Sequence, residues 1–179
     1  MKLCLGVGPL PIHRQHLEIL GDVSEWTLVD LYVKDPQIKN WDATKLDEVE
    51  DNSIEYIYAS HLLEHIPHIQ VKDVLKLWYS KLKEGGQLYI NVPDLEWAAD
   101  QLLLLRDNNL NGYYHRFDTE HGLLSIFYGS QSHDGEYHKS GFTNKYLREL
   151  LKEIGFSEVR VKPDFDAHSM GVLIATGVK

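Results

Sequence analysis

Two closely spaced glycines and two acids have the types and spacing of a binding site. Gly6 and Gly8 end the first apolar run of the chain. Asp30 stands at the carboxyl end of the second run, and Asp42 directly follows the third. Such glycines leave bare main chain for a ligand to lie against, and an acid about twenty residues further on suits the hydroxyls of a ribose. The spacing therefore predicts a nucleoside site.

The glycine pair also bears on which nucleoside cofactor fits. A dinucleotide site needs a third glycine so that a helix N-terminus can approach the pyrophosphate, but Pro11 stands at that position. S-adenosylmethionine carries no phosphate, and Asp42 is placed to accept a hydrogen bond from its adenine amino group. These residues favour S-adenosylmethionine over NAD or FAD.

A second pattern could bind metal. His61-Leu-Leu-Glu64-His65 matches the His-x-x-Glu-His pattern, in which two histidines on one helical face hold zinc and the glutamate activates water. That chemistry needs a long helix and a further acidic ligand, whereas here a strand leads straight into the motif and Pro67 ends any helix within a turn. We therefore expect no metal. A zinc hydrolase using His61, Glu64 and His65 stays as an alternative.

The elements that must position these residues follow from apolar patterning. Continuous or alternating apolar runs predict strands at residues 3–7, 27–31, 38–41, 54–59, 87–92, 157–162 and 171–175. Helical spacing and caps predict helices at residues 11–20, from Pro67 to a stop at Gly85-Gly86, over 95–105, and from Thr143 to Ile154. Residues 54–59 deliver Ser60 and His61 to the same sheet edge as Gly6 and Asp30.

Alternation of strand and helix predicts an α/β fold, a Rossmann-like three-layer sandwich with helices on both faces of a mostly parallel sheet. Too few residues separate the last two strands for a parallel crossover, so we expect them to pair antiparallel. The run at 171–175 is apolar throughout while 157–162 alternates, so the last strand should lie inside the edge and be more deeply buried.

Residues 107–142 lack any periodicity and are rich in Gly, Tyr, His, Asn and Ser. Connections this long within a compact domain are usually lids or binding loops. The histidines of this region could cluster, although a solvated loop also tolerates them: His115, His121, His133 and His138. We expect a single domain, residues 1–179, with a lid insert at about 107–142.

Composition excludes several classes of protein. A net charge of −9 opposes binding to phosphate backbones, so we expect no nucleic-acid partner. No apolar run is long enough for a membrane span, and nothing marks the N-terminus for secretion, so we expect a cytoplasmic protein without a membrane partner. The single cysteine, Cys4, excludes an internal disulfide and lies in an apolar run, where it should be buried.

Taken together, the motifs resemble those of class I S-adenosylmethionine-dependent methyltransferases. Five ordered segments carry the resemblance: Leu-Gly-Val-Gly, Val-Asp-Leu, Trp-Asp-Ala-Thr, Tyr-Ala-Ser-His-Leu-Leu-Glu-His-Ile, and Leu-Lys-Glu-Gly-Gly-Gln-Leu-Tyr-Ile-Asn-Val-Pro-Asp. More narrowly, the chain is similar to small bacterial predicted methyltransferases with a Ser-His-x-Leu-Glu-His motif, including its segments His138-Lys-Ser-Gly-Phe-Thr and Ile154-Gly-Phe. The resemblance spans nearly the whole chain. It implies a seven-stranded sheet with a reversed last strand inserted next to the edge.

The resemblance also implies roles for individual residues. It assigns S-adenosylmethionine to Leu5, Gly6, Val7, Gly8, Asp30, Leu31, Asp42, Ala43, Ser60 and His61. The glycines would lie under the cofactor, Asp30 at the ribose, Asp42 with Ala43 at the adenine, and Ser60 with His61 at the methionine end. His61, His65 and His138 are candidate general bases, since histidine is matched to neutral pH.

These features predict an enzyme that transfers a methyl group from S-adenosylmethionine to a small-molecule or sugar-like acceptor in a pocket formed by the insert. The loop departs from the family pattern, because Cys4 replaces a common acid and Leu10 a common glycine. A non-catalytic nucleoside-binding domain of the same fold is therefore a further alternative.

Overall fold

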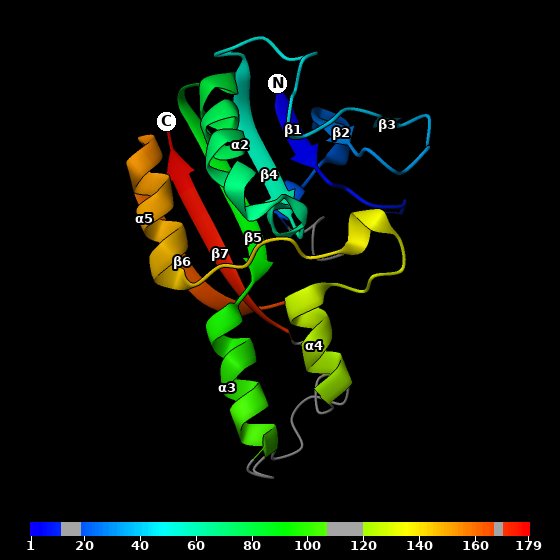
Figure 1. The fold of residues 1–179 in the computed structure, drawn as a ribbon. Helices are drawn as coiled ribbons and strands as arrows, with labels where there is room; N and C mark the ends of the chain where they lie inside the picture. Colours follow the sequence, from blue (N-terminus) through cyan, green and yellow to red (C-terminus); the bar gives the residue numbers. More distant parts are fainter. Residues whose placement is uncertain (12–18, 107–119, 167–169) are drawn as a thin grey trace.

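The computed structural model describes residues 1–11, 19–106, 120–166 and 170–179. Within these ranges a seven-stranded sheet is flanked by helices, with the two chain termini near the same end of the sheet (Figure 1). None of the helices in the described ranges is long and apolar enough to cross a membrane.

The sheet has the strand order β3-β2-β1-β4-β5-β7-β6. Its strands are β1 (Lys2–Leu5), β2 (Trp26–Val29), β3 (Ile38–Lys39), β4 (Ile54–Ser60), β5 (Leu82–Pro93), β6 (Ser157–Phe165) and β7 (Gly171–Val178). The first five strands pair in parallel, and β7 pairs antiparallel with both β5 and β6. This confirms the predicted α/β fold and the reversed last strand inside the edge.

The described helices are α2 (His68–Lys81), α3 (Leu95–Arg106), α4 (Glu120–Tyr128) and α5 (Asn144–Ile154), with short 3-10 helices η1 (Val23–Glu25), η2 (Leu63–His65) and η3 (Asp134–Glu136). Caps define two of them as expected. Asp94 Oδ1 accepts a hydrogen bond from the Glu96 N–H at the start of α3, and Thr143 Oγ1 accepts one from the Tyr146 N–H at the start of α5.

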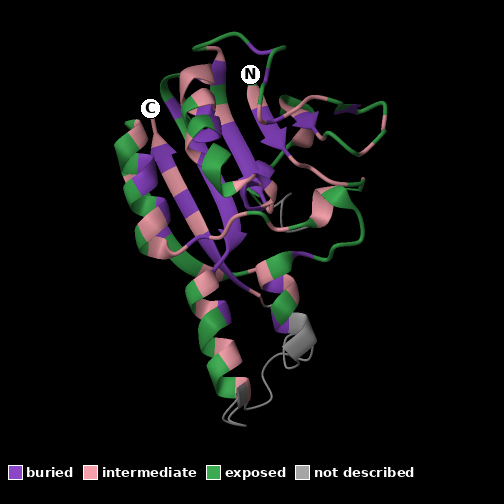
Figure 2. Ribbon diagram, in the orientation of Figure 1, coloured by how far each residue is buried: buried purple, intermediate pink, exposed green. Residues whose placement is uncertain are grey.

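Alternation along the strands divides the core between the two faces of the sheet. Leu3 and Leu5 of β1 face a large cluster to which α2 and α5 contribute, whereas Cys4 faces a second cluster with Leu28 and Tyr58. The central strands are therefore mostly buried, while the outer sides of the helices are exposed (Figure 2). The predicted helix at residues 11–20 lies largely outside the described residues.

The last two strands differ in burial as expected. Most of β7 is buried, whereas β6 is largely exposed apart from Val161. The difference follows from position, because β7 has a neighbour on each side and β6 forms the edge of the sheet.

The predicted helix stop at Gly85-Gly86 is wrong. Helix α2 ends at Lys81, and both glycines lie inside β5, where the Gly85 N–H donates to the Lys179 carbonyl and Gly86 O accepts from the Lys179 N–H. The pairing of β4 with β5 shifts register between Ile54 and Tyr56. Gly85 and Gly86 therefore lie at an irregularity in β5. Glycine is favoured both at strand irregularities and at helix ends, so the sequence alone does not distinguish the two.

The region 107–142, which lacks any periodicity in the sequence and is predicted to be a lid or binding loop, contains helix α4. This helix packs beside α3 (Figure 1), and Leu123 and Ile126 join Ala98 in a third apolar cluster. The helix has only nine residues, so its apolar pattern covers too few turns to indicate a helix in the sequence.

Cys4 is an inert thiol in this fold. Its exposure is 2%, and burial, with a smaller effect from the nearby Asp30 carboxylate, raises its pKa to about 12. Since the thiolate is the reactive form, Cys4 acts as a small apolar side chain.

Trp78 connects α2 to the loop after β3, and its replacement tests this link. Its ring is fully buried, and Nε1 donates a 2.8 Å hydrogen bond to the Ala43 carbonyl. We expect Trp78→Phe to lower the free energy of unfolding by about 1–3 kcal/mol, because it leaves a buried carbonyl without a donor. Urea unfolding would measure this loss.

Trp26→Phe is the matched control, since Trp26 Nε1 donates to the Leu20 carbonyl in a part-buried setting. Water can replace that donor, so its loss should cost less. An equal or larger cost for Trp26→Phe would contradict the anchoring role of Trp78.

Candidate functional site

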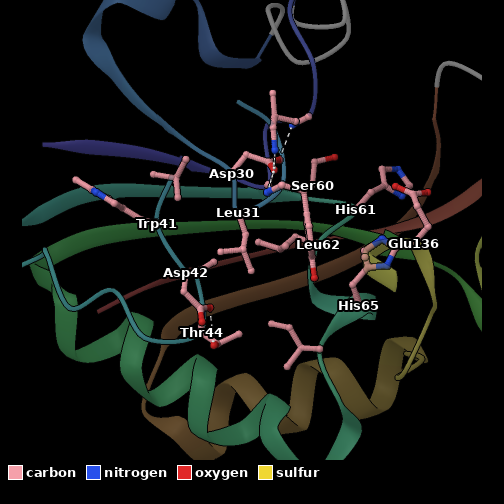
Figure 3. A pocket seen from close by; sticks show the side chains of 18 of the residues that line it. Asp30, Leu31, Trp41, Asp42, Thr44, Ser60, His61, Leu62, His65 and Glu136 are labelled. Carbon is pink, nitrogen blue, oxygen red and sulfur yellow. Dashed lines mark hydrogen bonds between the residues drawn. The ribbon is translucent and has the colours of Figure 1, made fainter. Parts of the chain in front are cut away.

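A cavity of about 480 Å³ opens beyond the carboxyl ends of β1, β2 and β4. The strand order reverses beside β1, because the chain continues from β1 to β2 and β3 on one side and to β4 and β5 on the other. Ligands of open α/β sheets bind at this kind of switch point. In Figure 3, Trp41, Asp42 and Thr44 lie toward one end of the cavity and His61, His65 and Glu136 toward the other.

The turn after β1 forms one wall of the cavity. Gly6 and Gly8 line it with φ angles of 67° and 70°, a conformation that costs side-chain-bearing residues energy. The N–H groups of Gly6 and Val7 both donate to the Val29 carbonyl, at 2.9 and 3.2 Å. A Cβ at Gly6 would lie 3.1 Å from Leu62, whereas one at Gly8 would meet no atom within 4 Å. Both positions therefore favour glycine because of their positive φ, and at Gly6 the close packing of Leu62 also leaves little room for a side chain.

Asp30 ties the turns after β1 and β2 together. Its Oδ2 accepts a 3.0 Å hydrogen bond from the Gly8 N–H, and its Oδ1 accepts from the N–H groups of Tyr32 and Val33 at 2.8 and 2.9 Å. A carboxylate offers about four acceptor positions, so about one remains for a ligand. A ribose that engages both oxygens must displace at least one of these backbone donors.

Asp42 holds the loop after β3. Its Oδ1 accepts hydrogen bonds from the N–H and the hydroxyl of Thr44, at 2.9 and 2.6 Å, while Oδ2 lies 3.2 Å from Lys45 Nζ. Burial raises the pKa of this carboxyl, but the bonds from Thr44 and Lys45 outweigh it, so the pKa lies below its usual value. Asp42 is thus ionised and can accept a further hydrogen bond.

The chain turns sharply after β4. His61 has a φ of 50°, its N–H donates to the Asn91 carbonyl, and the 3-10 helix η2 covers only Leu63–His65. The zinc-hydrolase pattern needs a continuous helix that presents two histidines on one face, and the structure does not provide one. His61 and His65 are therefore not arranged as in that class of enzyme.

Glu64 carries a buried charge beside this turn. Its exposure is 1%, and its Oε1 lies 3.2 Å from His61 Nδ1, while His61 Nε2 lies 3.9 Å from Asp166 Oδ2. Burial lowers the pKa of His61, but the two carboxylates outweigh it and raise the pKa above its usual value. Burial raises the pKa of Glu64, but His61, His65 and His138 lower it by more, so the pKa lies below its usual value. His61, whose side chain is 32% exposed, thus faces a fully buried carboxylate.

The segment after α4 closes the cavity from the other side. The N–H groups of Lys139 and Ser140 donate to the Glu64 carbonyl at 2.7 and 3.0 Å, and Ser140 Oγ donates to the Leu63 carbonyl. Four residues of the segment line the cavity: His133, Gly135, Glu136 and Lys139. These bonds fix the segment against the turn after β4.

The structure brings most of the sequence-predicted site residues to the cavity. Those that line it are Gly6, Gly8, Asp30, Leu31, Asp42, Ala43, Ser60, His61 and His65. Leu5 and Val7 are not among the described residues that line it, because their side chains pack into the two sheet-face clusters. His138 also lies outside the cavity wall, in edge-to-face contact with the His65 ring at 4.9 Å between centroids. His115 and the side chain of His121 lie outside the described residues.

Several lining residues did not stand out in the sequence. They include Tyr32, Trp41, Thr44, Leu62, Ile66 and the residues of the segment after α4. Trp41 and Thr44 flank the predicted Asp42 and could have been included by proximity. His133, Glu136 and Lys139 lie in the insert that is predicted to form the acceptor pocket, but nothing in the sequence singles out Glu136 or Lys139 as lining residues, because the contact of this segment with Glu64 is long-range.

The mixture of groups fits a nucleoside. Asp30 and Asp42 supply carboxylate acceptors, the glycine turn supplies open backbone, and Leu31, Trp41 and Leu62 supply apolar surface for a base. Convergent polar groups within a largely apolar cavity are typical of small-molecule sites, whose volumes are about 300–1,000 Å³.

The model of a family described as a methyltransferase domain matches residues 6–161. A search of curated proteins found no match to the sequence. The matched range includes every lining residue of the cavity.

Solved structures share the fold at low sequence identity. An S-adenosylmethionine-dependent methyltransferase from Archaeoglobus fulgidus is 15% identical, with a TM-score of 0.63 over 99% of this chain and 85% of its own. One from Methanosarcina mazei is 17% identical, with a TM-score of 0.61 over 99% and 91%. The 1,6-didemethyltoxoflavin-N1-methyltransferase of Burkholderia thailandensis, solved with 1,6-didemethyltoxoflavin and S-adenosylhomocysteine, is 18% identical, with a TM-score of 0.61 over 99% and 69%.

The hydrogen bonds by which Asp30 joins the turns after β1 and β2 can be tested without a ligand. We expect Asp30→Ala to speed amide hydrogen exchange at Gly8, Tyr32 and Val33 and to lower the free energy of unfolding by about 1–3 kcal/mol, because three donors lose a charged acceptor. Exchange followed by NMR resolves the three amides individually.

Asp35→Ala is the control, since Asp35 Oδ1 accepts only the Gln37 N–H in a neighbouring turn and does not line this cavity. It should leave exchange at Gly8 unchanged. Unchanged exchange at Gly8 in Asp30→Ala would remove Asp30 from this role.

Proposed function

The chain belongs to the methyltransferase domain family, and we propose that it transfers the methyl group of S-adenosylmethionine to a small-molecule acceptor. The observation that carries the proposal is the cavity at the switch point, where Gly6, Gly8, Asp30 and Asp42 converge. The low-identity structures support the fold, and three of their descriptions name S-adenosylmethionine or its demethylated product.

The proposed cofactor position follows from the groups on the cavity wall. Asp30 accepts hydrogen bonds from the ribose after giving up a backbone donor, and Asp42 accepts one from the adenine amino group. Leu31 and Trp41 flank the adenine. Ser60 and His61, which line the cavity at the carboxyl end of β4, would lie at the methionine end.

When bound, S-adenosylmethionine supplies a methyl group already activated by its sulfonium. The protein's task is then to hold the acceptor atom in line with the methyl and to exclude water, and positioning of this kind accounts for much of the rate in such reactions. The turn after β4 and the segment after α4, joined by the hydrogen bonds to the Glu64 carbonyl, form the rigid frame for this alignment.

The three predicted general bases differ in their surroundings and in whether they line the cavity. Both ring nitrogens of His61 face carboxylates, at 3.2 and 3.9 Å, which raise its pKa above the usual value and so favour the protonated ring over a proton acceptor. His65 lines the cavity, and His138 lies behind it. We therefore assign catalysis to positioning first. A base among His61, His65 and His138 stays a prediction.

A small acceptor is favoured by how the cavity is enclosed. Strand ends form one wall, and His133, Glu136 and Lys139 of the predicted lid insert form another, so an acceptor must enter a space shared with the cofactor. The Burkholderia structure holds 1,6-didemethyltoxoflavin together with S-adenosylhomocysteine. A net charge of −9 weighs against a nucleic-acid acceptor. We propose a neutral or cationic small molecule.

Gly8→Ala tests the cofactor site. The added methyl meets no protein atom within 4 Å, so it would occupy open space at the cavity wall. We expect calorimetry with S-adenosylhomocysteine to show 1:1 binding to the native protein. In Gly8→Ala binding should be at least about tenfold weaker, which corresponds to about 1.4 kcal/mol.

Gly85→Ala is the matched control. Its φ of 73° and its open surroundings reproduce the strain of Gly8→Ala, but it lies in β5 away from the cavity. Both variants should lose about 1–2 kcal/mol of stability, and only Gly8→Ala should lose affinity. No binding of S-adenosylhomocysteine to the native protein would contradict the proposed function, while tight binding with no methyl transfer to any tested small molecule would favour a non-catalytic nucleoside-binding domain.

A further inference from the structure

Glu64, His65 and His138 bring three potential metal ligands together beside the cavity. One ligand atom from each residue lies within 4.8 Å of the other two, the only such group of three among the residues that the structure describes. The rings of His65 and His138 meet edge to face at an interplanar angle of 72°. The three residues come from two segments more than seventy positions apart in the sequence.

Each histidine is oriented by a backbone carbonyl. His65 Nδ1 lies 3.2 Å from the Tyr137 carbonyl, and His138 Nδ1 lies 2.7 Å from the Ile126 carbonyl. A carbonyl only accepts, so in the neutral ring each Nδ1 would carry the proton and Nε2 would keep a lone pair. Metal-binding histidines are held in this way, with the second nitrogen donating to a carbonyl or carboxylate.

Glu64 completes the group with a buried carboxylate that lacks adequate partners. Its exposure is 1%, and neither Oε1 nor Oε2 has a hydrogen-bond partner of acceptable geometry. His61 lies 3.2 Å from Oε1, but it contacts one oxygen only. Leaving a charged group this poorly satisfied in a protein interior costs considerable free energy. A cation bound by the Glu64 carboxylate and one ring nitrogen of each histidine would satisfy all three groups at once.

The backbone makes the group rigid enough for this role. The Glu64 carbonyl accepts hydrogen bonds from the N–H groups of Lys139 and Ser140, directly beside His138. The cluster is thus held in place by main-chain bonds that do not depend on an ion.

We propose that Glu64, His65 and His138 bind one divalent transition-metal ion at the edge of the cavity. Two imidazoles and one carboxylate suit a first-row ion such as Zn²⁺ better than Mg²⁺ or Ca²⁺, which prefer oxygen ligands. Three protein ligands leave at least one coordination position open. Since His65 lines the cavity, the ion would lie next to it.

This site differs from the one suggested by the sequence motif. The motif pairs His61 with His65, whereas the structure turns both nitrogens of His61 toward Glu64 and Asp166 and brings His138 in its place. The expectation that no metal binds rested on the missing helix, and a site built from two segments does not need one. The proposal is independent of methyl transfer, because the ion is detected by its own binding.

The test uses the full chain without a histidine tag, treated with a chelator and then titrated with Zn²⁺ by calorimetry. Among first-row ions Zn²⁺ is one of the tightest binders, so it reveals a site of this type even where another ion is the natural occupant. We expect 1:1 binding and a rise in the unfolding temperature with Zn²⁺.

Three variants each remove one ligand with little change of shape: Glu64→Gln, His65→Asn and His138→Asn. The asparagine amide can still donate to the carbonyl that Nδ1 contacts, so folding should be preserved. Each variant should bind Zn²⁺ at least about 100-fold more weakly and lose the thermal shift, since loss of outer-shell partners alone costs 10–100-fold. His68→Asn, an exposed histidine on α2, should bind as the native protein does.

Far-UV circular dichroism identifies any variant that fails to fold, and the remaining ones carry the test. Absence of stoichiometric Zn²⁺ binding to the native protein overturns the proposal. So does native affinity in the folded ligand variants, which would place the ion elsewhere. Neither result bears on S-adenosylhomocysteine binding, which is measured separately.

Discussion

In the centre of the sheet, Leu5 of β1 pairs with Val29 of β2 on one side and with Ala59 of β4 on the other. Because the three strands are parallel and these residues are in register, the strands end next to one another at the same edge of the sheet. The strand register alone therefore places Gly6, Asp30 and Ser60 next to one another at the cavity. A shift of one residue in either register would turn the following side chains to the opposite face and dismantle the site.

The second constraint is the contact between the turn after β4 and the segment after α4. Main-chain bonds to the Glu64 carbonyl place Lys139 and its neighbours over the cavity, while the Glu64 side chain faces inward with His61, His65 and His138 around it. Glu64 thus holds the segment after α4 in place through its backbone carbonyl, and its side-chain carboxylate is the negative charge around which the histidines gather. The proposed metal ion would reinforce a junction that the backbone already forms.

The sequence was informative where local signals decide structure. Apolar runs identified the strands, and the residues that directly follow them, from Gly6 to His61, include the glycines and carboxylates of the wall beyond the strand ends, because parallel strands expose their carboxyl ends at one edge. The strand ends themselves were misplaced by a few residues. The glycines at 85 and 86 were misread as a helix stop, since a strand irregularity and a helix end call for the same residue.

Residues positioned by long-range contacts could not be predicted in this way. Helix α4 depends on packing against α3, and His138 depends on the bonds that join its neighbours to Glu64. The sequence motif pointed to His61 as the partner of His65, but a left-handed turn at His61 redirects the chain. A crystal structure with S-adenosylhomocysteine tests the central claim most directly. We predict its ribose at Asp30 and its adenine beside Asp42, and a ligand bound elsewhere, or an empty cavity at saturating ligand, would contradict the account.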